Sequence, residues 1–187
     1  TALHHFGLGE NRKTILVLGG SLGARTLNQA VLKDMAALEK AGYQVLWQCG
    51  KFYFKDMLAK MEESNLKHIH LREFIREMDL AYAAADVIVS RAGALSVSEL
   101  SLVGKPVIFI PSPNVAEDHQ TKNAMAFVNH QAALLLRDSE AVGQLKSKLD
   151  ALMEDPILVK SLGKNIKSLA KPDAANAIVN ELEQLIQ

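Results

Sequence analysis

The chain alternates between short continuous apolar runs and longer segments in which apolar residues recur every three or four positions. The first run, Thr-Ile-Leu-Val-Leu-Gly at 14–19, lacks polar alternation, which is typical of a parallel strand buried on both faces. The segment 24–41 follows with apolar side chains on one helical face, and Gly42 ends it. A strand and then a helix are therefore predicted over the first forty residues or so.

The same alternation continues along the rest of the chain. Further strands are predicted at 43–50, 68–71, 86–90, 105–111 and 132–137. Helices are predicted at 52–63, 78–85, 96–103 and about 119–130, and from 139 onward the pattern is helical, with interruptions at Pro156, Gly163 and Pro172. Six strands with intervening helices predict an α/β fold with a doubly wound parallel six-stranded sheet of the Rossmann-like kind. Ligands of such folds bind at the carboxyl ends of the strands, where the strand order reverses.

The first thirteen residues do not fit this alternation. They show no clear periodicity and do not begin with Met, so we expect a linker remnant over 1–13, one domain over 14–187, and a fragment of a longer protein. His4 and His5 have no Cys or acidic partner at ligand spacing, and we expect no metal site there.

Composition narrows the classes of function. The 187 residues are 49% hydrophobic, which is ordinary for a globular domain. Lys+Arg 21 balances Asp+Glu 21, so no overall field favours nucleic acid or a membrane surface. No apolar run approaches the ~20 residues of a membrane span, and no signal peptide opens the sequence. The single cysteine, Cys49, excludes an internal disulfide, and we expect it to be a small core residue in a reducing compartment.

A glycine-rich segment, Gly-Gly-Ser-Leu-Gly-Ala at 19–24, separates the first strand from its helix. Glycines let the backbone approach a phosphate, and the helix start offers free amides. The segment matches neither the dinucleotide fingerprint nor the Walker A loop, and no acidic ribose ligand ends the second strand. An NAD site is therefore disfavoured, while a phosphate loop and a tight turn without ligand both stay open.

The stretch Ser-Arg-Ala-Gly-Ala-Leu-Ser-Val-Ser-Glu at 90–99 follows the fourth strand. Gly93 permits a close turn, and we expect the amides of 94–97 to be free at a helix start and to form a seat for a diphosphate. Glu99 either closes a capping box with Ser96, which local rules favour, or accepts ribose hydroxyls. Arg91 is a cation for the diphosphate or for the fold, or a solvated strand end.

Phe74 and Ile75 lie in the loop after the third strand without strand or helix periodicity. Core packing is the default interpretation of this pair. The alternative is that they form the wall of a site for a flat aromatic base.

The loop after the fifth strand ends in the polar residues 117–121. The side-chain amides of Gln120 and Asn123 suit sugar hydroxyls, because an amide both donates and accepts. Asp118 is also a candidate helix cap. His119 is a weak candidate for a general base, because no nucleophile or second carboxylate completes a triad.

Four segments taken together, 15–31, 74–100, 104–113 and 117–124, resemble the carboxyl-terminal domain of the MurG family. These bacterial enzymes have the two-domain GT-B architecture and transfer N-acetylglucosamine from its UDP donor to lipid I, forming lipid II in peptidoglycan synthesis. The resemblance covers nearly the whole chain from Thr14. It implies that residues 14–187 are the donor-binding domain and that the amino-terminal acceptor domain is absent.

The resemblance implies roles for individual residues. Ser21 would contact the nucleotide or diphosphate, the backbone of Ile75 would pair with uracil, and Gln120 would bind the sugar. Glu99 would hold the ribose, which reverses the capping preference. The implied substrate-binding residues are Ser21, Ile75, Ala94, Leu95, Ser96, Val97, Ser98, Glu99 and Gln120, with Gly20, Gly23, Arg91, Gly93, His119 and Asn123 as further candidates.

The implied chemistry is an inverting displacement with no metal and no cofactor, in which helix amides after Gly93 stabilise the leaving UDP. The partners would be UDP-N-acetylglucosamine here, and lipid I and the membrane through the missing domain, with no nucleic acid. We expect no catalytic residue in this chain, and a peripheral location on the cytoplasmic face of the bacterial inner membrane. Another GT-B enzyme of UDP-sugars, such as an epimerase or a lipid glycosyltransferase, and a non-catalytic nucleotide-binding module remain alternatives.

Overall fold

The computed structural model describes residues 1–186 and shows one parallel six-stranded sheet in the order β3-β2-β1-β4-β5-β6. Its strands are β1 (Lys13–Leu18), β2 (Tyr43–Gln48), β3 (Ile69–Arg72), β4 (Val87–Ser90), β5 (Val107–Phe109) and β6 (Leu134–Leu135). The order runs outward from β1 to β3 and then restarts with β4 on the other side of β1. The predicted doubly wound parallel sheet is confirmed, and its reversal point lies between β1 and β4.

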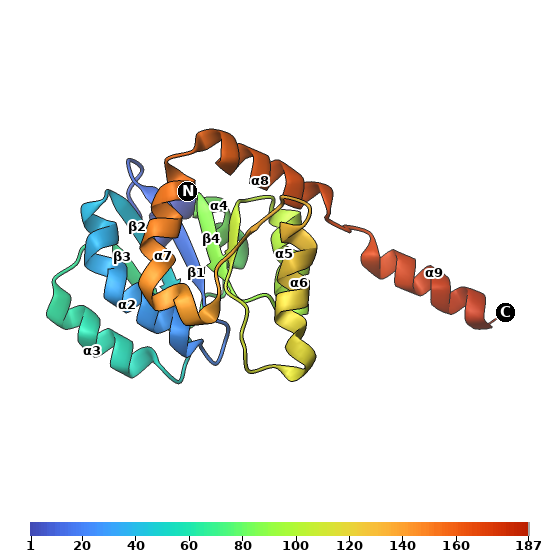
Figure 1. The fold of residues 1–187 in the computed structure, drawn as a ribbon, viewed down its shortest axis with the longest axis horizontal. Helices are drawn as coiled ribbons and strands as arrows, with labels where there is room; N and C mark the ends of the chain where they lie inside the picture. The colour runs from blue at the N-terminus through green and yellow to red at the C-terminus, as the bar shows by residue number, and fades with distance from the viewer. Residues whose placement is uncertain (187) are drawn as a thin grey trace.

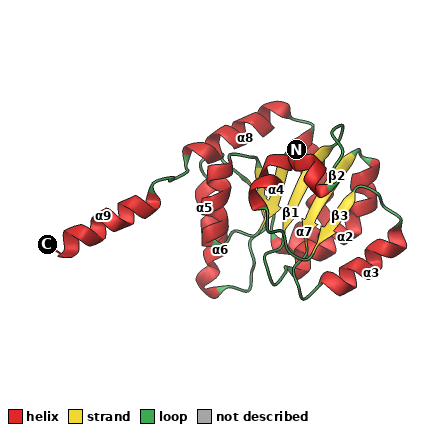
Figure 2. Ribbon diagram, turned by 180° about the vertical axis from the view of Figure 1, so that it is seen from behind, coloured by secondary structure: helices red, strands yellow, loops and turns green. Residues whose placement is uncertain are grey.

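Helices cover both faces of the sheet (Figures 1 and 2). One face carries α2 (Arg25–Lys40), α3 (Phe54–Ser64) and α7 (Asp138–Met153). The opposite face carries α1 (Ala2–Phe6), α4 (Met78–Ala84), α5 (Ala94–Val103) and α6 (His119–Val128), the last preceded by the short 3-10 turn η1 (Ala116–Asp118). Helix α8 (Pro156–Ser168) contributes to both cores, and α9 (Ala174–Ile186) extends away from the body.

The central strands are buried on both faces, as their continuous apolar runs predict. Ile15 and Val17 of β1 join the core beneath α2 and α7, whereas Leu16 and Leu18 join the core beneath α4 and α5. Because successive side chains of a strand point to opposite faces, a strand without polar residues has to be covered twice. Cys49, just after β2, is fully buried, and burial raises the pKa of its thiol to about 11. The prediction of a core cysteine is confirmed.

Residues 1–13 differ from the linker that the sequence led us to expect. Residues 2–6 form α1, and both Phe6 and Leu8 are buried against the layer that contains α4. The side chain of Gln44 accepts from the Gly9 amide and donates to the Gly9 carbonyl, each at 2.8 Å. A five-residue helix is too short to show periodicity, so the packing of this segment depends on contacts distant in sequence.

Two smaller expectations also need correction. The helix predicted at 96–103 begins two residues earlier, at Ala94, with Gly93 as its N-cap. Gly163 does not interrupt the carboxyl-terminal helices but lies inside α8, where a Cβ would come within 2.8 Å of the Gly104 carbonyl oxygen. Glycine here allows two backbones to approach closely, rather than ending a helix.

Candidate functional site

Two adjacent cavities open at the carboxyl ends of β1 and β4, where the strand order reverses. The smaller has a volume of about 210 Å³ and the larger about 490 Å³. Both are lined by Gly20, Arg91 and Ser96, so they meet between the loop after β1 and the start of α5. This is the position in which a doubly wound sheet binds its ligand.

The smaller cavity has mostly apolar walls with a few polar groups. Leu18, Phe74, Ile75 and Met78 line it, together with Gln48 from the end of β2. The Ile75 side chain is buried, while Phe74 is 53% exposed, so the predicted pair divides into one core residue and one open wall. The Ile75 amide donates to Gln48 Oε1 at 2.8 Å. Of the two backbone groups of Ile75, only the carbonyl is left to pair with a ligand. The pairing with uracil that the resemblance implies would therefore have to use this carbonyl as a hydrogen-bond acceptor.

Tyr82 of α4 lines the same cavity as Glu99 of α5. Burial, followed by the nearby Glu99 carboxylate, raises the pKa of the Tyr82 phenol above its ordinary value. The phenol therefore keeps its proton at neutral pH and is a donor beside an exposed carboxylate. Sequence reasoning did not find Tyr82, because it belongs to an alanine-rich helical turn with no motif of its own.

The glycine-rich loop has two separate functions. Gly23 and Gly50 pack backbone to backbone, and a Cβ on Gly50 would lie 2.1 Å from the Gly23 nitrogen. Gly20, with φ of 78°, would direct a Cβ into open space, and it lines both cavities. Gly23 thus holds the loop in place, while Gly20 and the exposed neighbouring Ser21 leave room for a ligand.

The start of α5 offers free amides, although one fewer than predicted. The Val97 amide donates to the Gly93 carbonyl at 2.9 Å inside the helix, so the expectation that it is free was wrong. The amides that precede it, at 94–96, are those that a helix leaves without an intrahelical acceptor. Ser98 Oγ donates to the Ala94 carbonyl at 3.0 Å, which turns this hydroxyl back onto its own helix.

The capping box that local rules favoured for Ser96 and Glu99, and that the resemblance set aside, is not formed. Gly93 occupies the N-cap position in an extended conformation, without a side-chain cap, and Ser96 lies three residues further along. A capping box needs its Ser at the N-cap and its Glu at the third helical position. Glu99 stands in the second turn instead, with its side chain at the smaller cavity.

Arg91 is committed to the protein itself. Its guanidinium donates to the carbonyls of Ile110, at 2.9 Å, and Pro111, at 3.1 Å, and pairs with Asp138 at 2.5 Å. Asp138 also accepts from Thr26 Oγ1 at 2.8 Å. Of the interpretations left open for Arg91, the geometry supports the fold-stabilising cation.

Gln120 and Asn123 of α6 both bind the turn that precedes α5. Gln120 Oε1 accepts from the amides of Ala92, at 3.3 Å, and Ser112, at 2.9 Å. Asn123 Nδ2 donates to the Ala92 carbonyl at 3.0 Å. The two side chains hold both backbone groups of Ala92 and so fix the turn before α5. Gln120 lines the larger cavity and keeps its amide hydrogens available for a ligand.

The structure does not support the candidate roles of His119 as a general base and of Asp118 as a helix cap. His119 is exposed, and its Nδ1 donates to the Ala116 carbonyl at 2.8 Å. Asp118 has a positive φ of 52° and makes no side-chain bond to an amide, but accepts from Thr121 Oγ1 at 2.6 Å. Neither supports catalysis, and Asp118 is not a side-chain cap.

The larger cavity also contains residues that sequence reasoning missed, namely Arg25, Thr26, Tyr53, Ser112, Asn114 and Asp138. Arg25 is exposed and is the first residue of α2, where a cation opposes the helix dipole. That unfavourable placement directly after the glycine loop was the available signal for an anion site. Of the predicted residues, Ala94, Leu95, Val97, Ser98, His119 and Asn123 do not line either cavity through their side chains.

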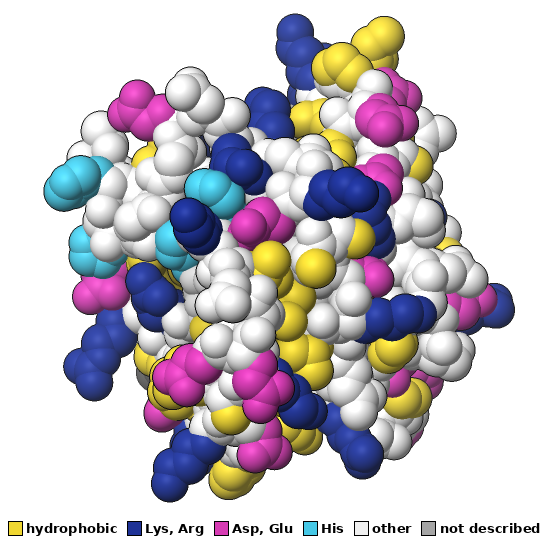
Figure 3. All heavy atoms as spheres, turned by 90° about the vertical axis from the view of Figure 1, so that its left-hand side faces the viewer, with side chains coloured by type: hydrophobic (Ala, Val, Ile, Leu, Met, Phe, Trp, Pro, Cys, Tyr) yellow, Lys and Arg dark blue, Asp and Glu magenta, His cyan; other side chains and the backbone are white. Residues whose placement is uncertain are grey.

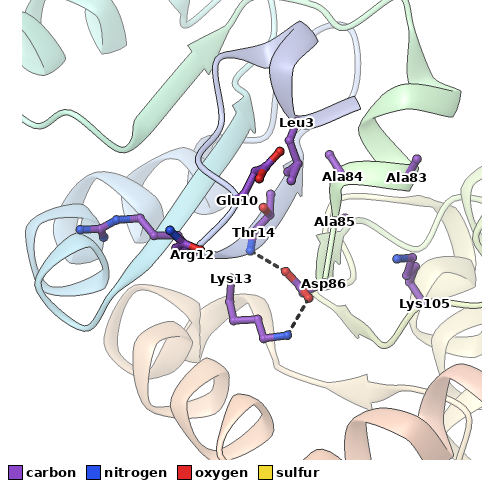
Figure 4. A pocket seen from close by; sticks show the side chains of 11 residues that line it. Leu3, Glu10, Arg12, Lys13, Thr14, Ala83, Ala84, Ala85, Asp86 and Lys105 are labelled. Atoms are coloured by element: carbon purple, nitrogen blue, oxygen red, sulfur yellow. Dashed lines mark hydrogen bonds and ion pairs between the residues drawn. The ribbon is translucent and has the colours of Figure 1, made fainter. Parts of the chain in front are cut away.

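A separate cavity of about 430 Å³ lies at the opposite end of the sheet, near the start of β1 (Figure 4). Its carboxylate, Asp86, accepts from the Thr14 amide at 2.8 Å and pairs with Lys13 at 3.0 Å. These contacts join the starts of β1 and β4. The cavity lies away from the carboxyl ends at which doubly wound sheets bind ligands.

Within residues 1–186, no group of three or more His, Cys, Asp or Glu side chains is arranged to hold a metal ion. No helix in that range is long and apolar enough to cross a bilayer. The face at the β3 and α3 end of the sheet carries interspersed charges of both signs (Figure 3).

A doubly wound parallel sheet with two cavities at its reversal point defines an α/β domain of the kind that binds its ligand at this edge. Comparison with known proteins specifies it further. Residues 14–178 match the Glycosyltransferase family 28 C-terminal domain, and the chain belongs to this family. The matched family is one of glycosyltransferases, whereas the fold alone does not distinguish a transferase from an epimerase.

Curated relatives support this assignment. The chain is 51% identical over 186 residues to the UDP-N-acetylglucosamine--N-acetylmuramyl-(pentapeptide) pyrophosphoryl-undecaprenol N-acetylglucosamine transferase of Flavobacterium psychrophilum, and 50% identical over 185 residues to that of Christiangramia forsetii. These alignments cover 100% and 99% of this chain and 50% of each relative. The chain therefore spans about half the length of the curated relatives it matches.

Solved structures agree with the fold. The MurG crystal structure from Acinetobacter baumannii superposes with a TM-score of 0.81 at 28% identity, covering 98% of this chain and 53% of that one. A UDP-GlcNAc 2-epimerase from Neisseria meningitidis, bound to UDP-GlcNAc, gives a TM-score of 0.69 at 14% identity, covering 98% of this chain and 48% of that one. The second likeness shows the fold alone.

Proposed function

We propose that this chain is the donor-binding half of a transferase that moves N-acetylglucosamine from UDP-N-acetylglucosamine to lipid-linked muramyl-pentapeptide. The observation that carries the proposal is the pair of cavities that meet at Gly20 and Ser96. An apolar compartment with a carboxylate suits a base and ribose, and a polar compartment beside free helix amides suits a diphosphate and a sugar. The names of the relatives provide the substrates.

Different residues of the site would bind the base, the ribose, the diphosphate and the sugar of the donor. The base would lie against Phe74 and the Ile75 carbonyl, and the ribose hydroxyls would donate to Glu99. The diphosphate would lie between Gly20 and the amides of 94–96, and the sugar would extend toward Gln120. Arg25 adds a positive charge at the larger cavity.

The chemical contribution of this half is electrostatic. Displacement at the anomeric carbon leaves negative charge on UDP, and fixed amides at the start of α5 stabilise that charge without reorganising. The acceptor oxygen, the base that takes its proton and the membrane contact belong, in this proposal, to the other half of the protein. We also propose a peripheral position on the cytoplasmic face of the bacterial inner membrane; the undecaprenol carrier in the relatives' names supports the contact with a membrane.

Calorimetry with four ligands tests the donor assignment. We expect UDP and UDP-N-acetylglucosamine to bind this chain, and NADH to bind at least tenfold more weakly, because the loop at 19–24 lacks the dinucleotide fingerprint. UDP-galactose is the matched control for the sugar compartment. NADH binding tighter than UDP binding, or no binding of UDP, would contradict the proposal.

A further inference from the structure

The Arg91–Asp138 ion pair lies at the larger cavity, where both partners line the wall. The two side chains are only 16% and 18% exposed. Withdrawing two charges from water costs about as much as their attraction returns, so such a pair contributes little net stability. The pair does fix the relative position of the two segments that carry it, because separating the charges would leave each one buried without a partner.

The pair connects four segments that are far apart in sequence. Arg91 follows β4 and reaches the carbonyls of Ile110 and Pro111 after β5. Asp138 is the first residue of α7 and reaches Thr26, the second residue of α2. The loop after β1, which contains Gly20, leads directly into α2, and the turn after Arg91 leads directly into α5. The chain of bonds thus joins the two walls between which the cavities meet.

We propose that Asp138 is a positioning residue for the diphosphate, acting through Arg91 and Thr26 to fix the distance between the glycine loop and the start of α5. This inference rests on the donor site of the proposed function. Asp138 does not touch the donor in this scheme but holds Nη1 of Arg91, the nitrogen that also donates to the carbonyls of Ile110 and Pro111. Backbone amides bind an anion well only when they are held at the correct spacing, so loosening the connection weakens diphosphate binding.

The nucleoside compartment provides an internal reference. Ile75, Tyr82 and Glu99 line the smaller cavity, and no bond of the Arg91–Asp138–Thr26 chain involves them. Gly20, Arg91 and Ser96 line both cavities, so a positioning effect on the diphosphate lowers the affinity for UDP by a larger factor than the affinity for uridine. General damage to the fold lowers both affinities together.

The test uses NMR-detected titration of this chain with UDP and with uridine, which covers weak as well as strong binding. We expect Asp138→Asn to weaken UDP binding about tenfold, equivalent to about 1.4 kcal/mol, with uridine affinity within twofold of wild type. Thr26→Val, which keeps the ion pair but removes the hydroxyl donor, should weaken UDP binding by a smaller factor. The double variant should be no weaker than Asp138→Asn alone, since both changes break one connection.

Asp150→Asn is the matched control, because Asp150 pairs with Lys146 on the same helix and lines neither cavity. It should leave both affinities unchanged. If Asp138→Asn fails to fold, Thr26→Val still tests the connection. Unchanged UDP affinity in Thr26→Val and Asp138→Asn, or equal losses for UDP and uridine, overturns this inference while the donor site stands. Failure of the wild-type chain to bind UDP overturns the proposed function instead.

Discussion

At Glu99 the structure excludes the capping role that local spacing favours. This residue lies in the second turn of α5, exposed at the smaller cavity and beside the protonated phenol of Tyr82. A carboxylate has about four acceptor positions, so one donor from Tyr82 leaves enough capacity for both hydroxyls of a ribose. The position is not that of a helix cap, which leaves the carboxylate free for the ribose role proposed above.

Replacing Glu99 by Gln tests this role. We expect Glu99→Gln to weaken UDP binding by about 1–3 kcal/mol, because a hydrogen bond to a charged acceptor is lost. The melting temperature should change little, since the side chain is exposed and makes no cap. Calorimetry and thermal unfolding measure the two effects on the same sample.

The exposed Glu63 on α3 lines neither cavity and provides the matched control. Glu63→Gln should leave UDP affinity unchanged. If Glu99→Gln keeps full UDP affinity but melts at a lower temperature, Glu99 is a structural residue and the ribose assignment fails.

The capping-box error shows what a local pattern can and cannot determine. The spacing Ser-x-x-Glu is the same whether the Ser is the N-cap or the third helical residue. The helix begins after Gly93, which takes an extended conformation and is the N-cap. Gln120 and Asn123 hold this turn through their hydrogen bonds to Ala92. Those contacts come from a helix about thirty residues further on, so the sequence near Ser96 contains no trace of them.

At the scale of elements, the contact between Gly23 and Gly50 joins the loops after β1 and β2. A Cβ on Gly50 would lie 2.1 Å from a backbone nitrogen of Gly23, and Gly50 also has a φ of 82°. Gly42 has a similar φ of 90°, but a Cβ there would meet nothing within 4 Å. The two glycines therefore share the conformational requirement and differ only in the packing.

This difference predicts unequal costs for the same substitution. Gly42→Ala should lower the free energy of unfolding by about 1–2 kcal/mol, because Ala is strained at positive φ. Gly50→Ala should cost at least about 2 kcal/mol more, since the two loops have to separate. Urea denaturation measures both free energies of unfolding. Equal losses would show that the two loops can move apart at no cost, and would contradict the prediction.

Elements with a local apolar pattern were predictable, including the short strands β3 and β4, whereas α1 was not. The apolar run of β1 and the helical face of α2 are local patterns, and both elements were predicted within one or two residues. Helix α1 has five residues, and its place depends on Phe6, Leu8 and the side chain of Gln44. The Arg91–Asp138 pair could not be predicted either. Its two residues are 47 positions apart in the sequence, and only the folded chain brings them together.

For the whole molecule, the decisive fact is that the matched relatives are about twice as long as this chain. The donor site described above is open at the larger cavity, and its polar groups are either bound to the protein or suited to phosphate and sugar. His119, the one candidate base near the sugar, is exposed, outside the lining and bonded to the Ala116 carbonyl. In the proposal made above, the proton acceptor and the acceptor cleft therefore belong to the other half of the protein.

We therefore predict that this chain alone binds its donor without transferring or hydrolysing it at a useful rate. Displacement at the anomeric carbon needs an acceptor oxygen held in line and a base within hydrogen-bonding reach, and these two effects together account for many orders of magnitude in rate. Radiolabelled UDP-N-acetylglucosamine with a lipid I analogue measures both reactions, and the full-length protein is the positive control. Because Nδ1 of His119 already donates to a carbonyl, His119→Ala should alter donor affinity only slightly in both proteins. Turnover by the isolated chain that disappears in His119→Ala would place the base on α6 and would refute the division of labour between the two halves.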